Sequence, residues 1–144
     1  MCIFNIKKLK IKLTSYTGYK YVIVINGKYY SPTTGIKYKV GKVPVLTSNM
    51  KLEIHGGNSI NQYLSPTSKY NSKNYNGNTS VFKSLKKCED ECKGKDIIKM
   101  TISGNLKKAK HSLTLGNIKD IHKSRISNVI IGNHIDKIEL IKTK

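Results

Sequence analysis

Apolar and polar residues alternate in short runs over the first 54 residues, and these runs predict β-strands. From position 8 to 13, lysine alternates with leucine or isoleucine, the pattern of a half-buried strand whose lysines face outward. The segment 19–25 is apolar on both faces after Lys20, which predicts a central strand. The next two residues, Asn26-Gly27, suit a type I′ turn, so we expect residues 28–30 to return antiparallel as a hairpin.

Further turns and short strands are predicted before residue 55. The segment 31–35 contains proline and glycine and reads as a second turn. In 36–40, apolar residues and a tyrosine share one strand face, with Lys37 and Lys39 on the other. Glycine and proline then interrupt the pattern, and 51–54 predicts one more short strand.

Residues 55–80 lack any such alternation and are rich in glycine, asparagine, serine and tyrosine. This composition predicts a long loop. Loops longer than about 12–15 residues are usually functional or disordered. We therefore expect either a binding insertion or a disordered segment here, within one domain that spans residues 1–144.

The clearest helix pattern follows this loop, near residues 84–93. Ser84 can cap its N-terminus, Leu85, Cys88 and Cys92 recur on one face, and Gly94 suits its C-terminal end. Glu89, Asp90 and Glu91 would form its solvated face.

The remaining segments return to strand patterns, at 97–102, 112–115, 126–131 and 135–141. Gly132-Asn133 between the last two predicts a hairpin. Together these elements predict an α+β fold, with a mostly antiparallel sheet of about seven to nine short strands and one short helix near 84–93.

Charge adds a functional expectation. The chain has 27 lysine and arginine residues against 8 acids, a net charge of +19, and residues 1–88 contain Glu53 as their one acid. Such an excess favours a polyanionic partner, most often nucleic acid. The alternative explanation is codon composition, because the codons of an A+T-rich genome favour lysine, isoleucine and asparagine. Glutamate is also encoded by A-rich codons, yet it occurs only four times, so codon bias alone does not explain the scarcity of acids.

The type of base limits specificity. Arg125 is the sole arginine, and lysine acts as a mobile point charge rather than a bidentate fork. We therefore expect any nucleic-acid binding to have little sequence specificity and a strong dependence on salt.

Tyrosines interleave with lysines in the mixture that stacks bases and grips phosphates. His55 precedes Gly56-Gly57, where backbone amides could bind an anion. The candidate nucleic-acid or anion-binding residues are Lys8, Lys10, Lys12, Lys20, Lys37, Lys39, Lys69, Lys73, Tyr30, Tyr63, Tyr70, Tyr75 and His55.

Catalytic and metal motifs are weak. Neither a P-loop nor a dinucleotide glycine motif occurs. Cys88 and Cys92 could present two thiols to one metal, but no further ligands have metal spacing, so we interpret both as core residues. The sequence predicts no catalytic residue, metal or cofactor, and with no apolar run of about eighteen residues it predicts no membrane span. The first residues lack a secretory signal, so we expect an intracellular protein.

Several short motifs resemble a loose group of small phage and bacterial proteins without an assigned function. They are Met1-Cys2, Tyr19-Lys20-Tyr21-Val22, and the series Ser31-Pro32, Gly35, Tyr38, Gly41-Lys42. The similarity continues at 81–85 and at 97–102, and covers about two thirds of the chain. Thr79-Ser80 replaces the group's Gly-Phe-His step, and 58–78 also departs from the pattern. The resemblance implies a viral or mobile-element origin and an α+β fold.

The leading hypothesis is a non-enzymatic basic protein of viral or phage type that binds nucleic acid or another polyanion, in the host cytoplasm or the virion. A host-interaction inhibitor, which sequesters a nucleotide signal or occupies a host factor, is a second class. A structural virion component is a third. An enzyme resembling ADP-ribosyltransferases, with Glu139 as its acid, is the weakest fit, because the first-strand arginine or histidine and the Ser-Thr-Ser step are missing.

Overall fold

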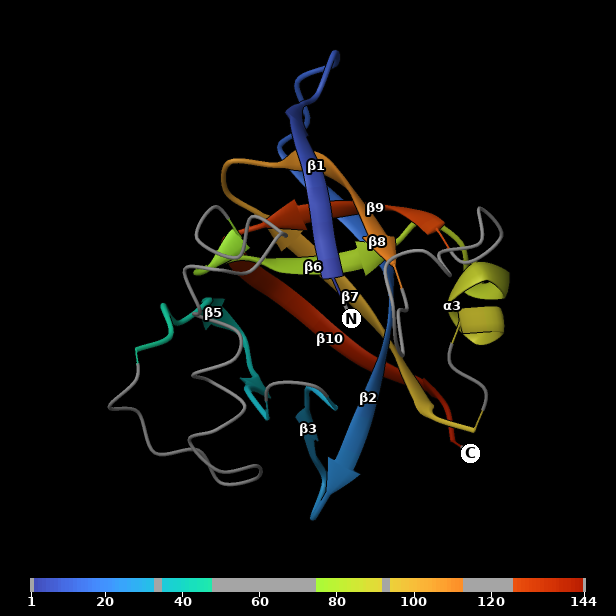
Figure 1. Ribbon diagram of the computed structural model, residues 1–144. Helices are drawn as coiled ribbons and strands as arrows, with labels where there is room; N and C mark the ends of the chain where they lie inside the picture. Colours follow the sequence, from blue (N-terminus) through green and yellow to red (C-terminus); the bar gives the residue numbers. More distant parts are fainter. Residues whose placement is uncertain (1, 33–34, 48–74, 92–93, 113–125, 144) are drawn as a thin grey trace.

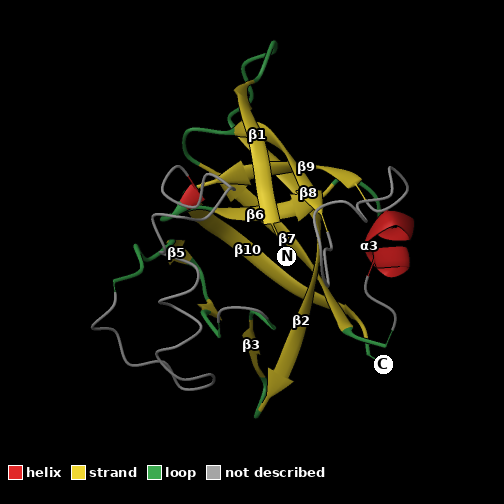
Figure 2. Ribbon diagram, in the orientation of Figure 1, coloured by secondary structure: helices red, strands yellow, loops and turns green. Residues whose placement is uncertain are grey.

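The computed structural model describes residues 2–32, 35–47, 75–91, 94–112 and 126–143. Figures 1 and 2 show an antiparallel β-structure with a short helix at its side. The elements are β1 (Cys2–Lys8), β2 (Ser15–Ile25), β3 (Lys28–Tyr30), β4 (Lys37–Tyr38), β5 (Gly41–Lys42), β6 (Thr79–Phe82), α3 (Leu85–Glu91), β7 (Asp96–Ser103), β8 (Lys107–Ser112), β9 (Ile126–Gly132) and β10 (His134–Lys142). The predicted antiparallel sheet with a short helix is confirmed, and the ten described strands slightly exceed the predicted number.

The strands follow the order β1-β8-β9-β6-β2-β7-β10-β5, with β3 paired to β2 and β4 paired to β3. The junction between β6 and β2 is narrow, because Tyr19 and Phe82 form its one register pair. Strand β2 also pairs with β7, over the longer stretch from Ser15 to Val22. In Figure 1, β6 and β9 cross the direction of β7 and β10, so the sheet path turns sharply at this junction.

Apolar side chains cover both sides of the sheet. One cluster includes Val22, Ile98, Met100 and Ile130, and the neighbouring positions Tyr21, Ile97 and Ile131 belong to a second cluster. Successive strand residues point to opposite faces, so these near-continuous apolar runs mark strands that are buried on both sides. All four residues of β6 are buried, which places this short strand at the centre.

The helix α3 begins as the sequence predicts. The backbone amide of Lys87 donates to the Ser84 hydroxyl at 3.1 Å, an N-terminal cap. Cys88 is buried in the second apolar cluster. The Ser127 hydroxyl donates to Glu91 at 3.0 Å, and Lys142 pairs with Glu89 at 3.2 Å, so α3 is joined to β9 and β10.

The predicted hairpin at Asn26-Gly27 is confirmed. Both residues have positive φ, 51° and 75°, as a type I′ turn requires. The turn after β3 is also present, since the amide of Gly35 donates to the carbonyl of Ser31 at 3.0 Å. The following strand is shorter than predicted, because β4 ends at Tyr38 and Val40 is 62% exposed.

Other predictions are wrong in part. The segment 8–13 is not a strand beyond Lys8, because pairing with β8 ends there. Strands β9 and β10 do not form a hairpin, since β10 pairs with β7 and β5. The amide of Asn133 instead donates to the carbonyls of Ser103 and Gly104 at the end of β7, both at 3.1 Å.

Four described strands were not predicted: β1 and β8, which overlap a predicted strand only at Lys8 and Ser112, and β5 and β6. Strand β6 takes Thr79 and Ser80 from the predicted loop. The predicted strand at 51–54, most of the loop at 55–80, and residues 113–115 lie outside the described residues.

Candidate polyanion interface

Strands β1 and β8 bring lysines from both ends of the sequence into direct opposition. Lys7 pairs with Lys108 and Lys8 pairs with Lys107 in the antiparallel register. Directly opposed residues share a face, with Cβ atoms about 4.5–5.5 Å apart, and like charges in this position are destabilising. Successive residues alternate, so each face of this strand pair has one such lysine pair.

A bulge in β1 produces this register. The pairing shifts between Phe4 and Lys7, and Asn5 has a φ of 58°, in the left-handed region. Before the bulge, Ile3 is buried opposite the buried His111. After it, Lys7 and Lys8 are exposed. The bulge therefore separates the buried Ile3 from the exposed Lys7 and Lys8.

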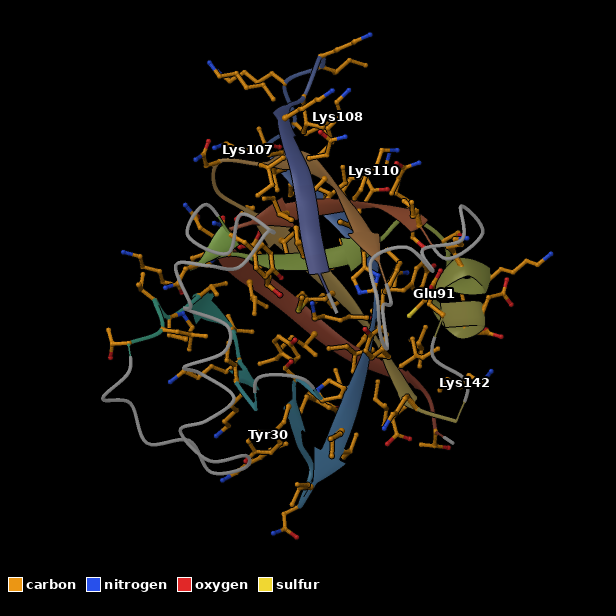
Figure 3. The ribbon with its side chains drawn as sticks, in the orientation of Figure 1. Tyr30, Glu91, Lys107, Lys108, Lys110 and Lys142 are labelled. Carbon is orange, nitrogen blue, oxygen red and sulfur yellow. The ribbon has the colours of Figure 1, made fainter. Side chains whose placement is uncertain are left out.

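Three further lysines extend this charged region. Lys110 follows on β8, where its ammonium group donates to the side-chain oxygen of Asn128 at 3.3 Å. Lys10 and Lys12 are exposed on the segment after β1. We call Lys7, Lys8, Lys10, Lys12, Lys107, Lys108 and Lys110 the lysine cluster. Figure 3 shows Lys107, Lys108 and Lys110 gathered beside β1.

The described acids lie elsewhere. Glu89, Asp90 and Glu91 belong to α3, Asp96 begins β7, and Asp136 and Glu139 are on β10. Each ion pair found within the described part of the chain uses an acid of α3 or β10. Figure 3 shows Glu91 on α3, apart from Lys107. Within the described part of the chain, no acid forms an ion pair with the lysine cluster.

The predicted site residues separate into three groups. Lys8, Lys10 and Lys12 lie in the lysine cluster. Lys37 is on β4 and Lys39 follows it, beside β3, which lies far from the charged end of β1 in Figure 1. The structure thus does not bring these two lysines to the same place. His55, Tyr63, Lys69, Tyr70 and Lys73 lie outside the described residues.

The prediction that Lys20 and Tyr30 contact a polyanion at the surface is wrong. Lys20 is 6% exposed and Tyr30 is 2% exposed, so neither presents its polar group or ring to an outside partner. Tyr75 is half-buried, packs against the second apolar cluster, and donates to the Ser80 hydroxyl at 3.3 Å. These side chains serve the interior, because tertiary packing covers Lys20 on β2 and Tyr30 on β3 and partly covers Tyr75 before β6.

The ammonium group of Lys20, on β2, is buried against the polar atoms of Ser80, on β6. It donates to the Ser80 carbonyl at 2.9 Å and to the Ser80 hydroxyl at 3.1 Å, and lies 5.2 Å from the centre of the Tyr38 ring. Burial lowers the pKa of Lys20 to about 8, with Cys88 acting weakly in the opposite direction. Burial also raises the pKa of Tyr75 to about 12.

His111 is a second buried titratable group. Its Nε2 lies 3.3 Å from the Tyr21 hydroxyl, and the Phe82 ring packs edge-on against it at 5.0 Å. Burial and the charge of Lys20 lower the pKa of His111 to about 3, so the imidazole is neutral at pH 7.

Ser103, His134 and Asp136 meet at the corner between β7 and β10. The Ser103 hydroxyl donates to Asp136 at 2.9 Å, and Nδ1 of His134 lies 2.6 Å from the same carboxylate oxygen. Nucleophilic catalysis requires the hydroxyl to bond a base. Here one oxygen of the Asp136 carboxylate binds both groups, so it links the end of β7 to the start of β10.

Sequence reasoning missed Lys7, Lys107, Lys108 and Lys110. The run Lys107-Lys108-Ala109-Lys110 was visible in the sequence, with a small residue among the lysines. Its meaning depends on β8 pairing with β1, about one hundred residues away in the sequence.

Comparisons with known proteins do not assign this chain to a family. No helix among the described residues is both long enough and apolar enough to cross a membrane. Searches against protein-family models, curated proteins and solved structures found no match, so the function is inferred from the lysine cluster itself.

Proposed function

We propose that this chain is a small basic non-enzymatic protein of viral or phage type that binds nucleic acid or another polyanion. The lysine cluster on β1, β8 and the segment after β1 is its contact surface. Binding there neutralises phosphates through point charges, so it has little sequence specificity. We propose that it acts inside the host cell or in the virion.

The observation that carries this proposal is the opposition of Lys7 to Lys108 and of Lys8 to Lys107. Each pair of directly opposed like charges destabilises the folded protein relative to neutral residues. A polyanion would remove that repulsion and release its own counterions. A merely solvated lysine surface would place its charges apart, or beside acids, whereas the acids among the described residues lie on α3, β7 and β10.

The test combines charge reversal with two measurements. Lys107→Glu with Lys108→Glu places a carboxylate opposite Lys8 and Lys7. We expect the affinity for labelled random oligonucleotides, measured by fluorescence anisotropy, to fall at least about tenfold, and the salt slope to fall by about two. We expect the free energy of unfolding, measured in urea, to stay equal or to rise, because the new pairs attract.

The matched control is Lys28→Glu with Lys39→Glu, two exposed lysines at the β3–β4 end. It changes the net charge equally. An equal loss of affinity in both double variants would show that net charge alone attracts the oligonucleotide, and would refute the assigned surface. Absence of binding by the unaltered protein even at about 50 mM salt would refute the proposed function.

A further inference from the structure

The segment between β1 and β2, residues 9–14, has an unusual surface. Ile11 is 73% exposed and Leu13 is 40% exposed, and exposed Lys10 and Lys12 flank Ile11. Among the described large hydrophobic side chains, Ile11 is the most exposed. Figure 1 shows this blue segment projecting beyond the strands. We call residues 9–14 the tip.

The base of the tip is fixed to the body of the protein. Leu9, the first residue of the tip, and Tyr16, two residues after the tip, both pack against the first apolar cluster. Just beyond Tyr16, the Thr17 hydroxyl bonds the Thr101 hydroxyl of β7 at 2.8 Å. The exposure of Ile11 is therefore a property of an anchored projection, with the paired lysines of β1 and β8 at its foot.

We propose that the tip is a wedge for duplex nucleic acid, in which Ile11 inserts between adjacent base pairs from the minor groove while the lysine cluster holds the flanking phosphates. This inference rests on the proposed function and names its partner class. Proteins that kink duplexes insert single apolar side chains such as isoleucine or leucine between base steps, flanked by cationic residues. The alternation Lys10-Ile11-Lys12 provides both parts within three residues.

The shape of the tip favours a duplex over an anionic membrane. Binding to a membrane surface strengthens with the apolar area that is buried, and typically uses several large side chains including aromatic ones. The tip has one largely exposed isoleucine, one partly exposed leucine and no aromatic residue. A wedge needs one side chain, and β-branched isoleucine suits it because its χ1 angle is restricted before binding.

Charge complementarity points the same way. Duplex DNA has about one negative charge per 1.7 Å of its axis, a density that seven lysines in a small area can match. The lysines lie on both faces of the β1–β8 pair and on the tip. They can therefore contact phosphates on either side of an inserted Ile11.

The experiment compares Ile11→Ser with Val40→Ser, because Val40 is another exposed β-branched residue, 62% exposed, outside the lysine cluster. A duplex of about 25 base pairs has 2-aminopurine at its centre and a donor–acceptor pair at its ends. The unaltered protein is expected to raise 2-aminopurine fluorescence by unstacking and to raise energy transfer by kinking the duplex. Circular dichroism verifies that both variants are folded.

For Ile11→Ser we expect both signals to disappear and the affinity to fall about three- to tenfold, with the salt slope unchanged. Val40→Ser should match the unaltered protein. If Ile11→Ser unstacks and kinks the duplex as the unaltered protein does, or the unaltered protein binds without either signal, the wedge is refuted while the proposed function stands. Sedimentation with phosphatidylserine vesicles that depends on Ile11, beside duplex binding that does not, would overturn the wedge in favour of a membrane.

Discussion

The ammonium group of Lys20 shows how burial changes the chemistry of one side chain. A lysine in water has a pKa near 10.5, and burial lowers that of Lys20 to about 8. Two hydrogen bonds to Ser80 and the Tyr38 ring offset part of the lost hydration. The folded protein therefore binds this proton less tightly than the unfolded chain does.

This difference predicts that stability rises with pH above about 8. Between pH 8 and 10.5 the unfolded chain holds more protons than the folded protein at this site, so the free energy of unfolding increases with pH, by at most about 1.4 kcal/mol per unit. Lys20→Met should flatten that rise in urea unfolding from about pH 7.5 to 9, a range in which tyrosine stays largely protonated. The control is Lys28→Met, at an exposed position. A rise of equal slope in Lys20→Met would contradict the assignment.

At the scale of elements, the junction between β2 and β6 depends on one glycine. A Cβ atom at Gly18 would lie 2.5 Å from the Phe82 carbonyl oxygen and 2.6 Å from Cγ2 of Val81. The sheet path turns at this point, where Tyr19 pairs with Phe82, so β6 approaches β2 more closely than a side chain permits. Backbone and a β-branched residue cannot move aside easily.

Gly18→Ala is therefore expected to destabilise the protein by about 1–3 kcal/mol, the usual cost of overpacking. Urea unfolding measures this change, and Ser15→Ala, at an exposed position of the same strand, is the control with little effect. Equal stability of Gly18→Ala and the unaltered protein would show that β6 can move away from β2.

At the scale of the whole molecule, the net charge of +19 opposes folding through self-repulsion. The Debye length shortens from about 30 Å at 0.01 M to about 8 Å at 0.15 M salt, so added salt screens this repulsion. We expect Tm to rise by several degrees between these concentrations while oligonucleotide affinity falls. Thermal unfolding followed by circular dichroism measures the first effect. A Tm that is constant or that falls with added salt would mean that the repulsion contributes little to stability.

Local pattern predicted those parts of the fold that local chemistry specifies. Asn26-Gly27 has the two positive φ angles that close the hairpin, and Ser84 caps α3 through its own hydroxyl. The apolar run around Val22 and the alternation around Met100 gave strands in the right places. Strand β6 escaped notice because Thr79-Ser80 has no apolar alternation, and its burial comes from β2 and β9 on either side.

The part of the candidate site that is local in the sequence could be predicted, and the part that depends on strand pairing could not. Lys8, Lys10 and Lys12 stand out in the sequence as a basic row, although they do not form one strand. Lys107 and Lys108, the register partners of Lys8 and Lys7, join the site through β1–β8 pairing, which no local signal specifies. Lys20 looks like any other lysine in the sequence, and its burial is decided by Ser80 and Tyr38.

The sequence by itself determined the antiparallel fold class, the turns after β2 and β3, the helix and the excess of positive charge, because each depends on composition or on residues close together in the chain. The tertiary structure alone decided which lysines face one another, which one is buried, and that Gly132-Asn133 is a corner rather than a hairpin. Those outcomes follow from pairing between distant strands, whose register is set by bulges, close glycine contacts and burial over the whole sheet.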